Sequence, residues 1–193
     1  MAGNGFGIVL NTESSADPVV EHNTVVRNHS HGIYGHWEGR GSVITRNEIR
    51  RNGGSGIHTT GFSPCPELRD NHVSRNEGDG IFVTESPIGG GPSECSALPV
   101  TGNTATRNAA DGIHVADNTM AVITERNRTD QNGDDGIDVG PARFANLLVT
   151  LTSNRADRNA DLGIEAVDQA TDGGGNRARR NGDPRQCVGV ACR

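Results

Sequence analysis

The chain has 193 residues, of which 27 are Gly, and only 32% are hydrophobic and 3% aromatic. Its sequence contains no apolar run near the roughly 20 residues that a membrane-spanning helix needs, and its first residues lack a charged segment followed by a hydrophobic one, so we expect neither a membrane span nor a retained signal peptide. The 18 basic residues, all Arg, face 24 acidic ones, and a net charge of -6 argues against a general nucleic-acid binder. Apolar content this low predicts disorder unless the chain is built of repeats.

A repeat is present, marked by the dipeptide Gly-Ile, which occurs seven times. The Ile positions are Ile8, Ile33, Ile57, Ile81, Ile113, Ile137 and Ile164, with spacings of 25, 24, 24, 32, 24 and 27 residues. From Ile33 onward, Asn stands five and ten residues before every Ile. The earlier Asn column is Asn23, Asn47, Asn71, Asn103, Asn127 and Asn154, and the later one is Asn28, Asn52, Asn76, Asn108, Asn132 and Asn159. A seventh copy at Asn176 and Asn181 places Gln186 in the Ile position.

A period near 24 residues leaves leucine-rich repeats and parallel β-solenoids as candidates. Leucine does not recur at the offsets that define this repeat, so the solenoid is favoured. The alternation in 112–115 and 136–139 is typical of a strand with one buried face, and we expect two or three short strands per coil, in about seven coils. Inward Asn amides are expected to hydrogen-bond from coil to coil, and the Gly before each Ile to provide a positive φ or a close backbone approach.

The units 47–57 and 103–113 resemble the right-handed parallel β-helix repeat of the pectate-lyase-like superfamily, which includes carbohydrate-binding and sugar-hydrolase modules. The resemblance covers nearly the whole chain. It implies an all-β fold, a single right-handed parallel β-helix over residues 1–193. It also implies a polysaccharide partner, with lyase, hydrolase and epimerase activities and non-catalytic roles all represented among such helices.

The two ends and one loop depart from the repeat. Ile8 lies too near the start for a complete coil, so we expect further N-terminal coils or a second copy of the chain to cover that end. Residues 86–99 form a predicted loop insertion, and residues 182–193 a C-terminal cap. Four Cys permit three pairings, of which Cys65–Cys95 and Cys187–Cys192 are favoured, and disulfides predict secretion; four free thiols are the alternative.

Candidate catalytic residues follow from the outward positions of the repeat. The residue after each Ile forms one predicted column: Tyr34, His58, Phe82, His114, Asp138 and Glu165. Acidic residues precede the Gly-Ile pairs: Asp79, Asp111, Asp134, Asp135 and Asp161. Neighbouring carboxylates raise one another's pKa or attract a cation such as calcium, and a carboxylate pair can cleave a glycosidic bond. Ordinary corner chemistry or solvated surface acids are the alternative.

The segment around Asp111 and the following Asp134-Asp135-Gly-Ile-Asp138 are similar to the acidic motifs of β-helical polygalacturonases. That similarity implies that Asp111, Asp134 and Asp135 hold the catalytic water and protonate the leaving group. The predicted catalytic set is Asp111, Asp134, Asp135, Asp138, Glu165 and His114.

Substrate-binding candidates are aromatic and basic. Tyr34, Trp37, His58 and Phe82 offer rings that stack on sugars. Arg recurs six residues before Ile, and Arg75 and Arg107 of that column are predicted to hold an anionic polymer, unless neighbouring acids neutralise them. His22, His29, His31 and His36 crowd the first full coil and raise the alternative of copper or zinc binding.

These features predict a secreted β-helix module that binds, and cleaves or epimerises, a polysaccharide, with calcium as the candidate cofactor. The main alternative is a non-catalytic spacer or assembly module. A periplasmic metal-binding protein is the third interpretation.

Overall fold

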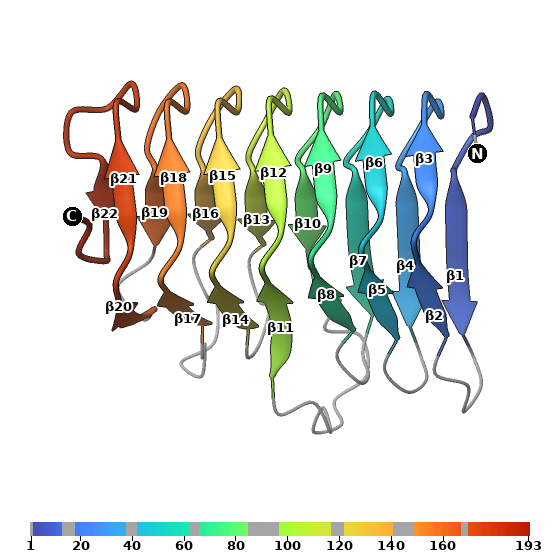
Figure 1. The fold of residues 1–193 in the computed structure, drawn as a ribbon, viewed down its shortest axis with the longest axis horizontal. Coiled ribbons are helices and arrows are strands. Elements are labelled where there is room, and N and C mark those ends of the chain that lie inside the picture. Colours follow the sequence, from blue (N-terminus) through green and yellow to red (C-terminus); the bar gives the residue numbers. More distant parts are fainter. Residues whose placement is uncertain are drawn as a thin grey trace.

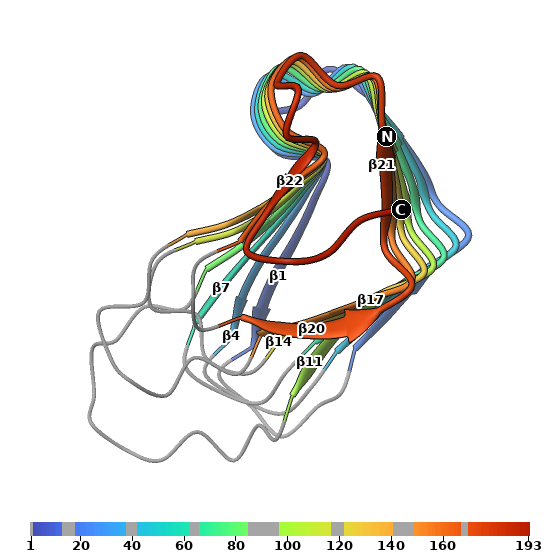
Figure 2. The same cartoon turned by 90° about the vertical axis from the view of Figure 1, so that its left-hand side faces the viewer.

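The computed structural model describes residues 2–12, 18–37, 42–61, 66–84, 97–116, 122–140, 149–166 and 170–193. Within these ranges the chain is all β, a parallel β-helix of short strands joined by turns (Figure 1). Viewed along its axis, successive coils superimpose, and three sheets enclose the core (Figure 2). No helix long and apolar enough to cross a membrane occurs in the described part of the chain.

Sheet A begins each coil and contains eight parallel strands. They are β1 (Ile8–Thr12), β4 (Ile33–Trp37), β7 (Ile57–Gly61), β10 (Ile81–Val83), β13 (Ile113–Val115), β16 (Ile137–Val139), β19 (Ile164–Ala166) and β22 (Cys187–Val188). The repeated Ile residues pair with one another in register from coil to coil, even across the 32-residue spacing between Ile81 and Ile113. From Ile33 to Ile164 they are fully buried. The predicted Ile column is therefore confirmed.

Sheet B follows sheet A in each coil and contains seven strands. They are β2 (Val19–Glu21), β5 (Val43–Thr45), β8 (Glu67–Arg69), β11 (Leu98–Thr101), β14 (Val122–Glu125), β17 (Val149–Thr152) and β20 (Thr171–Gly174). Buried side chains such as Ile44, Leu68 and Val100 point from it into the core.

Sheet C completes the coil and also has seven strands. They are β3 (Thr24–Val26), β6 (Glu48–Arg50), β9 (His72–Ser74), β12 (Thr104–Thr106), β15 (Arg128–Asp130), β18 (Arg155–Asp157) and β21 (Arg177–Arg179). Only the central residue of each three-residue strand faces the core, for example Val73 and Ala105, which are fully buried. Apart from Val26 on β3, its outward residues are polar, so this sheet presents a mainly hydrophilic face.

The two Asn columns form hydrogen-bonded ladders at the corners before and after sheet C, as predicted. The amide of Asn76, for instance, donates to Oδ1 of Asn108 at 3.0 Å, and the backbone N–H of Asn76 reaches the same oxygen at 3.1 Å. The amide nitrogen also bonds a backbone carbonyl in many coils, as Asn103 does with Leu68 at 2.8 Å. Each buried amide therefore satisfies corner groups that no strand pairs.

The Gly before each Ile is explained by close approach alone. A Cβ on Gly112 would lie 2.5 Å from the carbonyl oxygen of Gly136 in the next coil. Its φ is not positive, so that part of the prediction was wrong. Positive φ instead falls on the residue before each Asn, most often Arg, as in Arg75 at 56° and Arg107 at 58°. There the left-handed turn reverses the chain at the corner.

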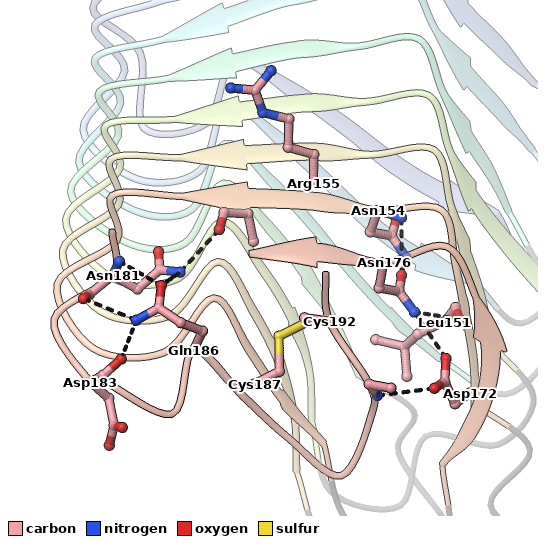
Figure 3. The surroundings of a disulfide bond; sticks show 12 residues. Leu151, Asn154, Arg155, Asp172, Asn176, Asn181, Asp183, Gln186, Cys187 and Cys192 are labelled. Atoms are coloured by element: carbon pink, nitrogen blue, oxygen red, sulfur yellow. Dashed lines mark hydrogen bonds between the residues drawn. A yellow bond between two sulfur atoms is a disulfide. The ribbon is translucent and has the colours of Figure 1, made fainter. Parts of the chain in front are cut away.

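The C-terminal segment closes the last coil with a disulfide between Cys187 and Cys192, as predicted (Figure 3). Cys187, and not Gln186, pairs with Ile164, so Gln186 does not take the Ile position. Its Oε1 instead accepts from the backbone N–H and amide of Asn181 at 3.0 and 3.1 Å. Gln186 thus ends the ladder where a further Asn would stand. Cys65, Cys95 and most of the 86–99 insertion lie outside the described residues.

Candidate functional site

The outward face of sheet A carries two parallel columns of side chains, which together we name the strip. The outer column holds the residue after each Ile, paired in register along the sheet: Tyr34, His58, Phe82, His114, Asp138 and Glu165. The inner column holds the residue two positions before each Ile: His31, Ser55, Asp79, Asp111, Asp135 and Leu162. Strand alternation points the outer column away from the core, as predicted.

The first half of the strip is a continuous series of rings. Ring centroids lie 5.2 Å apart for Tyr34 and His58, 4.7 Å for His58 and Phe82, and 5.0 Å for Phe82 and His114. Phe6 extends the series at 5.4 Å from Tyr34 and is 40% exposed. Strand pairing fixes this spacing, because each ring stands on a backbone held about 4.8 Å from the next. The result is a half-exposed aromatic surface along the helix axis.

The inner column is anchored by hydrogen bonds that run along the axis. Oδ1 of Asp79 accepts the backbone N–H of Asp111 at 3.2 Å, and Oδ1 of Asp111 accepts that of Asp135 at 2.8 Å. Asp135 in turn accepts the backbone N–H of Leu162 at 2.6 Å. His31 does the same through Nδ1, which accepts the N–H of Ser55 at 2.9 Å. These side chains are therefore fixed in position before any ligand arrives.

The two columns meet chemically at His114. Its Nδ1 lies 3.5 Å from Oδ2 of Asp111, and its Nε2 lies 3.5 Å from Oδ2 of Asp138. The Asp111 side chain is 9% exposed, whereas those of His114 and Asp138 are 29% and 25% exposed. The imidazole is thus held between a buried and an accessible carboxyl group.

The acidic half of the strip has strongly perturbed ionisation. Burial, reinforced by the charges of Asp138, Asp79 and Asp134, raises the pKa of Asp111 to about 7. Burial, followed by the charges of Asp111, Asp134 and Glu165, raises the pKa of Asp135 to about 8. Burial also raises the pKa of Asp138, although His114 opposes the shift. Neutral carboxyl groups are therefore present near pH 7, where they can donate or accept protons.

His31 and His58 form a second pair in the aromatic half. Nδ1 of His58 lies 3.1 Å from Nε2 of His31. Because Nδ1 of His31 accepts a backbone N–H, its Nε2 is the protonated nitrogen and donates to His58. Burial lowers the pKa of both rings, that of His58 to about 4 with a further contribution from His31. Both are neutral at pH 7 and serve as aromatic surface.

Three groups in the described residues, two of which share Asp135, bring potential metal-ligating atoms within 4.8 Å of one another. They are Asp79, Asp111 and His114; Asp134, Asp135 and Asp161; and Asp135, Asp138 and Glu165. The second and third groups offer only carboxylate oxygens, the ligands that calcium prefers, and the third includes Asp138, which lies beside His114 on the outer column. None of the groups contains His22, His29, His31 or His36, the cluster singled out for copper or zinc.

The structure separates the predicted acidic residues into buried and exposed ones, and it places the predicted arginines on a different face from the strip. Asp134 and Asp161 stand one residue before the inner column and are exposed, whereas Asp111 and Asp135 are buried. Arg75 follows β9 of sheet C, which lies on the other side of the helix from sheet A, and Arg107 follows β12 in the next coil (Figure 2). The Trp37 side chain lies outside the described residues.

The part that two rings, those of His31 and Phe6, play on this face is not predicted from the sequence. His31 was considered only as a metal ligand, although it stands at the same offset from Ile as Asp79 and Asp111. Phe6 occupies this offset before Ile8 and starts the ring series. Both residues stand two positions before a repeated Ile, and this shared offset is the sequence signal that identifies them.

Known proteins share this architecture. Two structures of the periplasmic alginate epimerase AlgG, a T265N mutant and a T265N T268M double mutant, align with TM-scores of 0.72 and 0.71 at 18% identity. Each alignment covers 97% of this chain and 47% of AlgG. The A-module of Azotobacter vinelandii mannuronan C-5 epimerase AlgE4 aligns with a TM-score of 0.60 and 16% identity, over 91% of this chain and 49% of the module. The chain spans about half the length of these structures, and at this identity the likeness concerns the fold.

No curated protein matches the sequence. A family model described as the right-handed β-helix region matches residues 34–149, which is more than half of the chain. The three parallel sheets of the structure, whose strands follow one another from coil to coil, agree with that match. The chain therefore belongs to the right-handed β-helix family.

Proposed function

We propose that the protein binds a polysaccharide along the strip and modifies it by proton transfer at the Asp111–His114–Asp138 cluster. The main support is that the ring series and the cluster form one continuous surface. The series from Phe6 to Phe82 ends beside the cluster, where the ring centroids of Phe82 and His114 are 5.0 Å apart. Aromatic rings in a row bind the apolar faces of successive sugars. A polymer held there places one of its sugars over His114.

The cluster suits acid–base chemistry better than nucleophilic attack. A general acid or base works best when its pKa is near the working pH, and Asp111 has a pKa of about 7. His114 can exchange a proton with the substrate while Asp111 and Asp138 hold its ring. Proton removal from the carbon beside a uronate carboxylate is the first step of both epimerisation and lyase-type elimination. The alginate epimerases with the same fold support the epimerase as the first candidate.

The acidic half of the strip repels a negatively charged uronate chain unless the negative charge of the strip is reduced. Protonation of Asp111 and Asp135 removes part of that charge near pH 7. Asp135, Asp138 and Glu165 would hold a calcium ion, which neutralises carboxylate charge when bound. We therefore expect calcium or mildly acidic pH to favour binding of an anionic polymer at the strip.

The proposed location is outside the cell or in the periplasm. The Cys187–Cys192 disulfide supports this, because such bonds persist in oxidising compartments. The periplasmic origin stated for AlgG is in line with it.

The test is product analysis of a panel of neutral and uronic-acid polysaccharides, incubated with calcium or with chelator. We expect altered sugar composition of one uronate polymer, retained by Glu67→Gln on sheet B and abolished by His114→Gln. Phe82→Ala should raise KM more than it lowers kcat, since the ring binds but transfers no proton. Shortening of a neutral polymer would indicate a hydrolase instead. An unchanged panel would favour the spacer interpretation.

A further inference from the structure

A hollow on sheet C lies away from the strip and has the opposite charge. It has a volume of about 420 Å³ and is formed over β9, β12 and β15. Four of its ten lining residues are Arg and only one is acidic, in a protein whose net charge is -6. The arginines are Arg75, Arg107, Arg128 and Arg158.

The shape of the hollow follows from side-chain size. The outward positions at its floor hold three short hydroxyl residues and one imidazole: Ser74 on β9 pairs with Thr106 on β12, and His72 pairs with Thr104. Longer Arg side chains stand around them: Arg75, Arg107 and Arg158 at the corner after sheet C, and Arg128 on β15. A floor of hydroxyl groups beneath guanidinium walls offers hydrogen-bond donors and positive charge together.

Most of this charge is not neutralised within the protein. In the described part of the chain, Arg75, Arg107 and Arg158 form no ion pair, and the guanidinium of Arg107 donates only to Oε1 of Gln131, at 2.8 Å. Arg128 is the exception, because it pairs with the buried carboxylate of Asp130. Some exposed arginines elsewhere are neutralised, as Arg155 is by Asp157. Others in the same corner column, Arg27 and Arg180, form no ion pair with the described residues either. The neutralised edge considered in the sequence is therefore not what these three residues form.

The arrangement selects a class of ligand. Arg75 and Arg107 occupy the same corner of successive coils, so their backbones stand about 4.8 Å apart along the axis, and Arg158 continues the row beyond Gln131. Such a row fits a linear chain whose acidic groups recur along its length. A nucleic acid is disfavoured, because no Phe, Tyr or Trp lines the hollow to stack on bases.

We propose that the sheet C hollow is a second, non-catalytic site that binds the carboxylate or sulfate groups of an acidic polysaccharide. It goes beyond the strip, since it needs neither the rings nor the acids of sheet A. It would hold an anionic polymer on the protein by a face that attracts it, while the acidic strip by itself repels it.

The test is direct binding of alginate oligomers, measured by calorimetry in a His114→Gln background without calcium, so that neither turnover nor cation bridging contributes. The double variant Arg75→Gln and Arg107→Gln removes two charges from the hollow. Gln131 occupies the same left-handed corner at φ 61°, so the fold tolerates this residue there. The control, Arg27→Gln with Arg180→Gln, removes two charges from the same corner column outside the hollow.

We expect the hollow variant to lose roughly tenfold or more in affinity, because hydrogen bonds to charged groups contribute about that factor each. The control should stay within about twofold of the parent, and carboxyl-reduced oligomers should not bind. Equal losses in both variants, or none in the hollow variant, would overturn the proposal. Tighter binding of single-stranded DNA than of the oligomers would assign the hollow to nucleic acid, and competition by millimolar inorganic sulfate alone would extend it to sulfated polymers.

Discussion

Replacing Asp111 by Asn should stabilise the protein at neutral and alkaline pH while impairing its activity. The side-chain oxygen that accepts the N–H of Asp135 at 2.8 Å is kept, so the change removes only the ionisable group. Burial raises the pKa of Asp111 from 3.8 to about 7. The folded state therefore binds this proton more tightly than the unfolded state, and the stability that the proton confers is lost as pH rises from about 4 through about 7.

The size of the effect follows from linkage. At about 1.4 kcal/mol per pH unit, ionising Asp111 in the folded protein costs at most about 4 kcal/mol above pH 7. Relaxation and residual hydration reduce this, and we expect Asp111→Asn to gain between about 1 and 4 kcal/mol at pH 8 and almost nothing near pH 3.5. Urea unfolding followed by far-UV circular dichroism at several pH values measures the difference.

Asp172 provides the control of opposite sign. Its carboxylate accepts the backbone N–H groups of Ala191 and Gly174, which lower its pKa, so its contribution is lost as pH falls. Asp172→Asn should therefore give no gain at pH 8. A gain for Asp111→Asn that is the same at pH 3.5 and pH 8, or a loss at pH 8, would refute the assignment of a buried, charge-strained carboxyl group.

Three further predictions concern the scaffold. Asn108→Ala should cost about 3 kcal/mol or more in urea unfolding, because it leaves the backbone N–H and the side-chain amide of Asn76 without their acceptor. Asn23→Ala, at the start of the other ladder, should cost less, because Asn23 donates to Asn47 but accepts from no earlier ladder Asn; equal costs would contradict the ladder's role. Gly112→Ala should prevent folding or lower the melting temperature sharply, as its Cβ would lie 2.5 Å from a carbonyl oxygen of the next coil, and a wild-type melting curve would show that the coils can separate. Cys187→Ser should cost about 2 kcal/mol or less, since Cys192 closes only a short loop, and hydrogen exchange should rise in the last coil alone.

The sequence was sufficient to predict the scaffold because every coil has the same packing and hydrogen-bonding requirements. Each coil must place Ile in the core and Asn at two corners, so identical residues recur at fixed offsets, and periodicity alone predicts the register. Positive φ and close backbone approach both favour Gly, so the sequence could not distinguish these two reasons for the Gly before each Ile. The corner Arg residues carry the positive φ, which nothing in their chemistry signals.

The site was less predictable because its residues do not repeat. The outer column could be read from strand alternation, but the difference between buried Asp111 and Asp135 and exposed Asp134 depends on a one-residue offset at a turn. The Arg residues looked like part of one binding surface with the rings. They belong to another face. Arg75 directly follows sheet C, whereas His114 stands on sheet A, and the two sheets lie on different sides of the helix.

Incubation of mannuronan with the protein in deuterated water tests the proposed proton transfer between His114 and a polysaccharide. Nuclear magnetic resonance of the product reports both deuterium at C-5 and any new double bond. We predict that the wild-type protein, with calcium present, replaces the C-5 proton with deuterium and that His114→Gln does not. Unlabelled, unchanged mannuronan with the wild-type protein would contradict the account, and so would equal labelling by the variant.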